Sequence, residues 1–283
     1  MRNITPMEIG LVFWAEQYAD TVLRQLDALG IHSGQIGVLP DLRCGLVLED
    51  WKKGLNEWNV SVTSAVCSYM GEDYTNLETV HKTVGLTTEG LRSDRIARTK
   101  VVSDFARALD IPALSCHIGF IPSHPREVLY EDLRDLTKLL CDYCGRNDQN
   151  FVLETGQESA DVLLLFIHNV DRPNLKVNFD PANMIIYQSG DPLAALEVLS
   201  PHLISVHCKD AHSPTDGSTG HLGEECALGD GDVDFLAFLQ LLKKIGYQGV
   251  LSIEREEPDS KKRIEDIKTG ISRLKQWKAN LGL

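Results

Sequence analysis

The chain has 283 residues, of which 43% are hydrophobic and 24% are charged, a composition that is ordinary for a globular protein. This length suits either two ordinary domains or one α/β barrel, and no run of about 18 apolar residues predicts a membrane-spanning helix. The formal net charge of −13 argues against nucleic acid as the main partner, because phosphate binding depends on clustered Lys and Arg.

The N-terminus and the cysteines favour a cytoplasmic protein. The first residues contain no long apolar stretch of the kind that marks a signal peptide. Seven scattered cysteines, an odd number, are typical of reduced thiols. Cys141 and Cys144 form a lone C-x-x-C without two further zinc ligands at a familiar spacing, and we interpret them as two residues on one helix face.

Short apolar runs alternate with helical patterns along the whole chain. Eight runs predict strands at residues 9–14, 35–39, 60–66, 112–120, 151–154, 175–180, 203–208 and 249–254. Apolar residues at helical spacing lie between them, and a long charged helix is expected over about 259–280. Asp191-Pro192 predicts a helix start, and so does Asp232 as the cap of the helix that follows it.

Eight strand–helix units with nearly continuous apolar strands predict a buried parallel sheet. That sheet is either a closed (β/α)₈ barrel or a doubly wound open sheet. No G-x-G-x-x-G follows the first strand, and the count of eight and the length favour the barrel. No linker or low-complexity segment interrupts the chain, so we expect an α/β fold with a single TIM-barrel domain over 1–283.

Two long connections, 68–88 and 210–232, each follow a predicted strand and therefore belong to the C-terminal face, where active sites of this fold lie. Residues 210–231 include five glycines, and we expect them to close over the site. The glycine-rich stretch before Asp232 looks like a phosphate loop but lacks the Lys and Ser/Thr of a P-loop.

Four consecutive strands finish with a side chain that can bind a metal. These residues are Glu154, Asp180, His207 and Glu254. Each alone has an ordinary interpretation: a carboxylate before proline caps a turn, a glutamate ends a strand, and a single histidine is structural. Together at equivalent strand ends they predict a site for one divalent ion, for which oxygen ligands with one imidazole favour Mn²⁺, Mg²⁺ or Co²⁺, with Zn²⁺ as a further candidate.

Several stretches carry a resemblance to a known family. They are 151-FVLETGQE-158, 178-NFDPANM-184, 205-SVHCKDA-211, 228-LGDGDVDF-235 and 246-GYQGVLSIERE-256. The chain resembles the xylose isomerase-like TIM-barrel superfamily, which includes sugar and sugar-phosphate isomerases and epimerases, inosose dehydratases and apurinic endonucleases. The resemblance implies that the four strand-end residues hold one metal ion, which chelates a ketose carbonyl and an adjacent hydroxyl. It also implies that Glu154 and Glu254 lie on opposite faces of the substrate, where one removes a proton and the other returns it through an enediolate.

Two positions depart from that family. Many of its epimerases have D-x-x-H where this chain has Asp180-Pro-Ala-Asn183, and Asn183 can hydrogen-bond a substrate oxygen but does not titrate. Some have an arginine shortly after the histidine of the seventh strand. This chain has Lys209 there, which either serves the substrate electrostatically or pairs with Asp210.

Three further residues are candidate substrate contacts, each with a structural alternative. His117 lies at the end of the predicted fourth strand and either contacts the substrate or is a core histidine bonded to the backbone. Trp14 ends the first strand and forms a wall for a sugar face or packs in the core. Glu158 lies near the rim or is only a charge at a helix start.

The favoured function is a metal-dependent isomerase or epimerase of a ketose or related small sugar, phosphorylated or not. The nearest alternative is an inosose-dehydratase-type lyase acting on a keto-inositol, because both reactions begin with the same proton abstraction. A nuclease is disfavoured by Asn183 and by the acidic charge, and a non-catalytic sugar-binding protein by the two opposed glutamates. We expect a small sugar or polyol partner and no membrane, and leave a homo-oligomer open.

Overall fold

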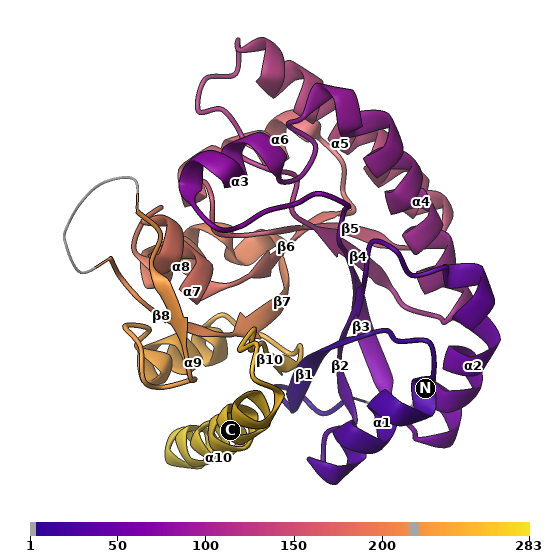
Figure 1. Ribbon diagram of the computed structural model, residues 1–283. Coiled ribbons are helices and arrows are strands. Elements are labelled where there is room, and N and C mark those ends of the chain that lie inside the picture. Colours follow the sequence, from indigo (N-terminus) through magenta and orange to yellow (C-terminus); the bar gives the residue numbers. More distant parts are fainter. Residues whose placement is uncertain (1–3, 215–220) are drawn as a thin grey trace.

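A computed structural model describes residues 4–214 and 221–283 (Figure 1). Within them, eight parallel strands close into a barrel in the order β1-β10-β7-β6-β5-β4-β3-β2. The barrel strands are β1 (Ile9–Trp14), β2 (Ser33–Val38), β3 (Ser61–Cys67), β4 (Ala113–Cys116), β5 (Asn150–Glu154), β6 (Leu175–Phe179), β7 (Leu203–Cys208) and β10 (Leu251–Ile253). Because β1 pairs with both β2 and β10, the open doubly wound sheet is excluded and the predicted barrel is confirmed.

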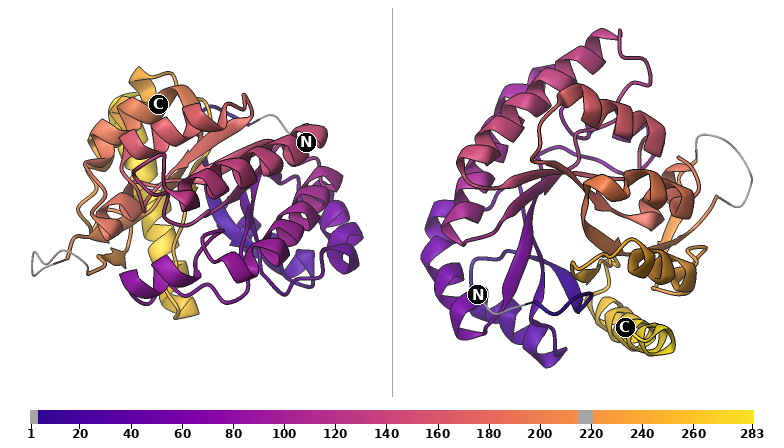
Figure 2. Two further views of the ribbon diagram at one scale, coloured as in Figure 1. Left: turned by 90° about the horizontal axis from the view of Figure 1, so that it is seen from above. Right: turned by 180° about the vertical axis from the view of Figure 1, so that it is seen from behind.

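Helices surround the strands in all the views (Figures 1 and 2). They are α1 (Ala19–Ala28), α2 (Cys44–Glu57), α3 (Leu77–Thr83), α4 (Arg92–Ala108), α5 (Val128–Arg146), α6 (Ala160–Val170), α7 (Pro181–Tyr187), α8 (Pro192–Leu199), α9 (Phe235–Lys244) and α10 (Ser260–Leu281), with 3₁₀ turns η1 (Glu89–Leu91) and η2 (Ser200–His202). Large apolar side chains such as Trp51, Phe166 and Phe238 are fully buried, and they pack in the hydrophobic layer between the helices and the barrel. None of the helices described is long and apolar enough to span a bilayer.

One of the two predicted helix N-caps is confirmed by the structure, and the other is wrong. Asp191 accepts a hydrogen bond from the Ala194 amide at the start of α8, as predicted. The prediction for Asp232 was wrong: α9 is capped by Asp234, which stands directly before Phe235 and accepts from the Ala237 amide. Asp232 instead accepts from the amide of Ser213, near the other end of the same connection, 210–232.

The fourth strand is shorter than its apolar run predicts. β4 ends at Cys116, and the backbone then leaves the sheet, with the Ile118 carbonyl accepting from the Leu86 amide. Gly119 has φ +87°, and a Cβ there would lie 2.6 Å from the Val84 carbonyl oxygen. The connection 68–88 therefore ends the strand by packing its own backbone against residues 118–119.

The second long connection contains a small antiparallel ribbon that the sequence did not predict. It pairs β8 (Asp210–His212) with β9 (Glu224–Cys226). The predicted closing movement of 210–231 falls partly on 215–220, which lie outside the described residues. The ribbon itself packs against α7, next to the C-terminal end of the barrel.

Asp210 holds the base of this ribbon. Its buried carboxylate accepts from the amides of Ala211 (2.9 Å) and Val233 (3.1 Å) through Oδ1, and from those of Gly229 (2.8 Å) and Gly231 (3.0 Å) through Oδ2. A Cβ at Gly231 would lie 2.3 Å from Oδ1, so the close approach requires glycine. The glycine-rich stretch is therefore an internal nest for this chain's own carboxylate.

We expect Asp210→Ala to lower the free energy of unfolding by about 2–4 kcal/mol, because it removes the acceptor of four amides, and an unpaired buried amide costs about 1–3 kcal/mol before water re-solvates part of the set. Urea denaturation measures the change, with Asp41→Ala at an exposed position as the control. A loss below about 0.5 kcal/mol, the range of an ordinary surface change, would contradict this role.

Candidate metal centre

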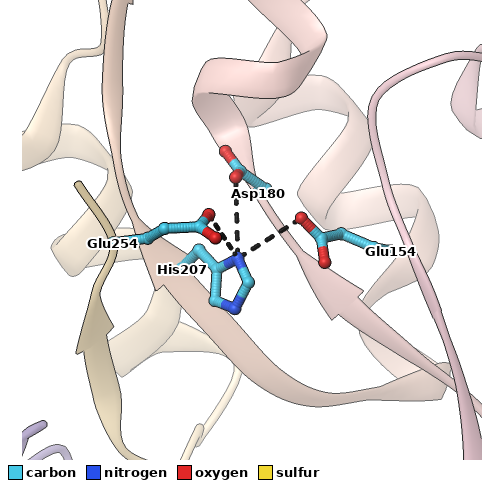
Figure 3. Close-up of side chains that lie close together, drawn as sticks. All are labelled: Glu154, Asp180, His207 and Glu254. Carbon is cyan, nitrogen blue, oxygen red and sulfur yellow. Dashed lines mark ion pairs between the residues drawn. The ribbon is translucent and has the colours of Figure 1, made fainter. Parts of the chain in front are cut away.

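Four side chains from adjacent barrel strands converge on one point (Figure 3). Glu154 ends β5, Asp180 follows β6, His207 lies in β7 and Glu254 follows β10. One ligand atom of each lies within 4.8 Å of those of the others. His207 Nδ1 is 3.0 Å from Glu254 Oε2, 3.4 Å from Glu154 Oε1 and 3.6 Å from Asp180 Oδ2. The structure thus brings together all four residues that the sequence predicted as metal ligands.

The ends of the strands are fixed by local bonds. The Glu254 amide donates to the Cys208 carbonyl, which extends the pairing of β10 with β7 by one residue. Thr155 Oγ1 lies 2.8 Å from the Asp180 amide and 3.1 Å from its carbonyl, tying the ends of β5 and β6 together. Asp180 caps α7 through Oδ1, which accepts from the Asn183 amide, and directs Oδ2 into the cluster. Asp180 therefore caps a helix and also points one oxygen into the cluster; its role as a metal ligand stays a prediction.

The donor set fits a divalent cation. Asp180 Oδ2 and His207 Nδ1 are buried and have no hydrogen-bond partner within residues 4–214 and 221–283, which is costly for a carboxylate oxygen and a ring nitrogen. Burial lowers the pKa of His207, but the Glu254 and Glu154 charges outweigh it and raise that pKa well above its ordinary value. Burial raises the pKa of Asp180. Protons and a cation therefore compete for the same atoms, and a divalent ion would satisfy the two unpaired ones.

A buried polar network orients His207 from behind. Its Nε2 lies 3.3 Å from Gln35 Oε1 and 3.1 Å from Asn178 Nδ2. Asn178 is held in turn by Gln35 Nε2 and Ser205 Oγ, which both donate to its Oδ1. In the tautomer with the proton on Nε2, that nitrogen donates to Gln35 Oε1 and the Nδ1 lone pair points at the carboxylates, as a metal ligand needs.

Sequence reasoning missed this network, although a signal was present. Asn178 and Ser205 each stand two residues before a predicted ligand, Asp180 and His207. Side chains two apart in a strand lie on the same face, so polar residues at these positions in otherwise apolar strands face the same interior.

The two glutamates have different neighbours. Glu154 Oε1 accepts from Asn183 Nδ2 at 3.0 Å and lies 3.6 Å from His117 Nε2. Glu254 Oε2 lies 3.3 Å from the ammonium of Lys209. Burial raises the pKa of Glu254, but Lys209 and His207 outweigh it, and the net shift is downward.

Lys209 is held by the site and not by its neighbour in sequence. Its buried ammonium lies between Glu254 and Glu256, 3.5 Å from Glu256 Oε2. The alternative pairing with Asp210 is wrong, because the Asp210 carboxylate is occupied by the four backbone amides.

A cavity of about 440 Å³ opens above the cluster. Its polar lining includes the predicted residues Glu154, Glu254, His117, Asn183 and Lys209, and its apolar lining includes Trp14, Tyr74, Ile186, Tyr187 and Leu222. Trp14 is 38% exposed, so it is a cavity wall and not a core residue. Tyr74 comes from the long connection 68–88, which sequence reasoning placed on this face without naming the residue.

Glu158 and the cysteine pair lie elsewhere. Glu158 does not line the cavity; burial raises its pKa to about 8, and backbone hydrogen bonds at Ile121 and Glu158 oppose that shift. Its predicted substrate contact is therefore not supported by its position. Cys141 and Cys144 are both buried on α5, as expected for two residues on one helix face.

Comparisons with known proteins agree with this geometry. The family model for xylose isomerase-like TIM barrels matches residues 23–277. An uncharacterized protein of Methanocaldococcus jannaschii, MJ1311, is 30% identical over 52% of this chain and 52% of its own length, and YihM of Escherichia coli is 29% identical over 53% and 46%. The chain thus spans about half the length of the curated relatives it matches.

Solved structures extend the similarity over almost the whole chain. A xylose isomerase domain protein from Planctomyces limnophilus has a TM-score of 0.92 and 35% identity, covering 98% of this chain and 99% of its own. A D-allulose 3-epimerase from Methylomonas sp. in complex with D-allulose has a TM-score of 0.68 and 17% identity, covering 96% and 98%.

Two further structures share the fold at a TM-score of 0.68 and 14% identity. One is a xylose isomerase-like protein from Mycobacterium smegmatis in complex with magnesium, covering 96% of both chains. The other is a probable 3-DHS dehydratase from Bacillus anthracis, covering 94% of this chain and 99% of its own. The closed barrel and the match over residues 23–277 together show that the chain belongs to the xylose isomerase-like TIM-barrel family.

Proposed function

We propose that this chain is a divalent-metal-dependent isomerase or epimerase of a ketose or related small sugar. The observation that carries the proposal is the placement of Glu154 and Glu254 on opposite sides of His207, with both carboxylates lining one cavity (Figure 3). Their strands, β5 and β10, are separated by β6 and β7 on one side of the barrel and by four strands on the other. Two carboxylates so placed can reach one substrate carbon from two faces.

The ligands proposed for the ion are Glu154, Asp180, His207 and Glu254. A divalent ion bound there would polarise a substrate carbonyl and make the neighbouring C–H more acidic. One glutamate then takes the proton from one face, and the other returns a proton to the opposite face, which inverts that carbon.

The surrounding donors suit the oxygens of a sugar. Asn183 Nδ2, the His117 ring and the Lys209 ammonium all line the cavity beside the two glutamates. We assign them to binding substrate hydroxyl or carbonyl oxygens. Trp14 would offer an apolar wall to the C–H face of the sugar.

A dehydratase remains the second candidate, because loss of hydroxide follows the same proton abstraction and one structural neighbour is a probable dehydratase. Incubation of the Mn²⁺-loaded protein in D₂O with a panel of ketoses and inososes separates the two reactions by NMR. Epimerisation gives deuterium at one carbon and a new epimer, whereas dehydration gives a diketone. A protein with full metal content that catalyses neither change on any member of the panel would contradict the proposal.

A further inference from the structure

We infer that the substrate of this site is an uncharged sugar or polyol, without a phosphate or other anionic group. The inference rests on the proposed function and narrows its substrate class. Two separate features carry it: the charge of the cavity lining, and the occupation of the backbone nest around Asp210 in the connection that follows β7.

The cavity lining is strongly acidic. Its carboxylates are Glu72, Glu154, Glu225, Glu254 and Glu256. Among the lining residues that the structure describes, Lys209 is the one Lys or Arg, and its ammonium already lies between Glu254 at 3.3 Å and Glu256 at 3.5 Å. His117, the other side chain there that can carry positive charge, lies 3.6 Å from Glu154 Oε1.

A phosphate in this cavity would meet carboxylates without a free cation to pair with. A divalent ion at the cluster would offset the charge of its own three carboxylate ligands. Glu256 would still face the outer cavity, whereas the Glu225 carboxylate there is paired with Arg255 at 3.0 Å. Like charges brought together in a binding site cost several kcal/mol, whereas phosphate recognition uses Arg, Lys or unpaired backbone amides. The lining therefore disfavours binding of a sugar that carries an anionic group.

The backbone amides that could replace a cation are also occupied. TIM barrels frequently bind phosphate at the loops after the seventh and eighth strands. Here the amides of that region, at Gly229, Gly231 and Val233, all donate to Asp210. The connection from 210 to 232 has no Lys or Arg in its sequence. This chain's own carboxylate thus fills the nest that a phosphate would need.

The walls fit a neutral polyhydroxy compound. Trp14, Tyr74 and Tyr187 present aromatic surface to the cavity, above the hydrogen-bonding groups of its floor. Small-molecule sites of this kind combine apolar walls with a few placed polar groups, and 440 Å³ lies within their usual size range. A sugar ring offers C–H faces to such walls and hydroxyls to such a floor.

Matched pairs of substrates test the inference. The Mn²⁺-loaded protein is incubated in D₂O with D-fructose and D-fructose 6-phosphate, D-xylulose and D-xylulose 5-phosphate, and D-ribulose and D-ribulose 5-phosphate. We expect exchange on uncharged members, with kcat/KM at least about 100-fold lower for the phosphorylated partner, the effect of about 2.7 kcal/mol. Equal or faster exchange on the phosphorylated members would overturn the inference and leave the proposed reaction intact.

If no member exchanges, the proposed function fails, and binding then decides the substrate class. Water-proton relaxation of the bound Mn²⁺ reports entry of each sugar in the same samples. A change with uncharged members alone supports the inference. A relaxation change with the phosphorylated members overturns it. So does an equal response to the two partners of each pair, including no response to either.

A charge-reversed variant provides a second test. Glu256→Lys places a cation in the outer cavity at a side chain that is 60% exposed, so folding should be preserved. We expect it to raise the preference for phosphorylated over uncharged partners by about tenfold or more, while Glu131→Lys, the same charge change at an exposed position of α5, leaves it unaltered. An equal effect of the two variants, or none at Glu256, would contradict the role of the lining.

Discussion

His207→Ala is expected to remove the metal and the activity together. In the proposed site the imidazole would supply the nitrogen ligand, since Nδ1 lies 3.0–3.6 Å from the three carboxylates of the cluster. Loss of a partner behind a metal-binding histidine already costs about 10- to 100-fold in metal affinity, and loss of the ligand itself should cost more. Elemental analysis of protein equilibrated with limiting Mn²⁺ gives the metal content, and circular dichroism checks that the variant is folded.

Two further variants should lose less metal affinity than His207→Ala. Gln35→Met keeps the side-chain volume but removes the acceptor 3.3 Å from His207 Nε2, so we expect a loss of about 10- to 100-fold in affinity. His124→Ala, at an exposed position, should leave the affinity unchanged. Full metal occupancy in His207→Ala, or equal losses in all three variants, would reject the ligand assignment.

Glu154→Gln and Glu254→Gln should each retain the ion and lose turnover by about 10²–10⁴, the usual contribution of general acid–base catalysis. Glutamine keeps the shape and one ligating oxygen of glutamate but removes the base. Each variant should also lose interconversion of the two epimers, with any residual solvent exchange confined to the epimer whose C–H faces the remaining glutamate. Deuterium incorporation into the two epimers, followed separately by NMR, measures this.

Glu256→Gln is the matched control for these variants. It lies in the same cavity but is 60% exposed and outside the cluster, so we expect turnover to change by less than about tenfold. Gln variants of Glu154 or Glu254 that bind metal and exchange both epimers at nearly the rate of the unaltered protein would contradict the two-base mechanism.

The fold and the four clustered residues were predictable because a barrel repeats one geometry. Eight apolar runs with a polar residue at the ends of the last four are enough to place Glu154, Asp180, His207 and Glu254 around one opening. The C-terminal ends of the strands lie at one level of the barrel, so the position of a residue along its strand predicts where it lies in space.

Other features depend on contacts between segments far apart in the chain. β4 ends early because Ile118 bonds to Leu86 in another connection, and no local pattern encodes that bond. Lys209 pairs with Glu254 and Glu256 and not with the adjacent Asp210. Three of the four amides that bind Asp210 become its neighbours only when the ribbon folds.

Diffraction from crystals grown with Mn²⁺ tests the central claim most directly. Data collected at the manganese absorption edge locate the ion without reference to activity or substrate. The account predicts one anomalous peak between Glu154, Asp180, His207 Nδ1 and Glu254, bonded to each of them, in every copy of the chain. No peak at that position with the ion in excess, or a peak bound by other residues, would contradict it.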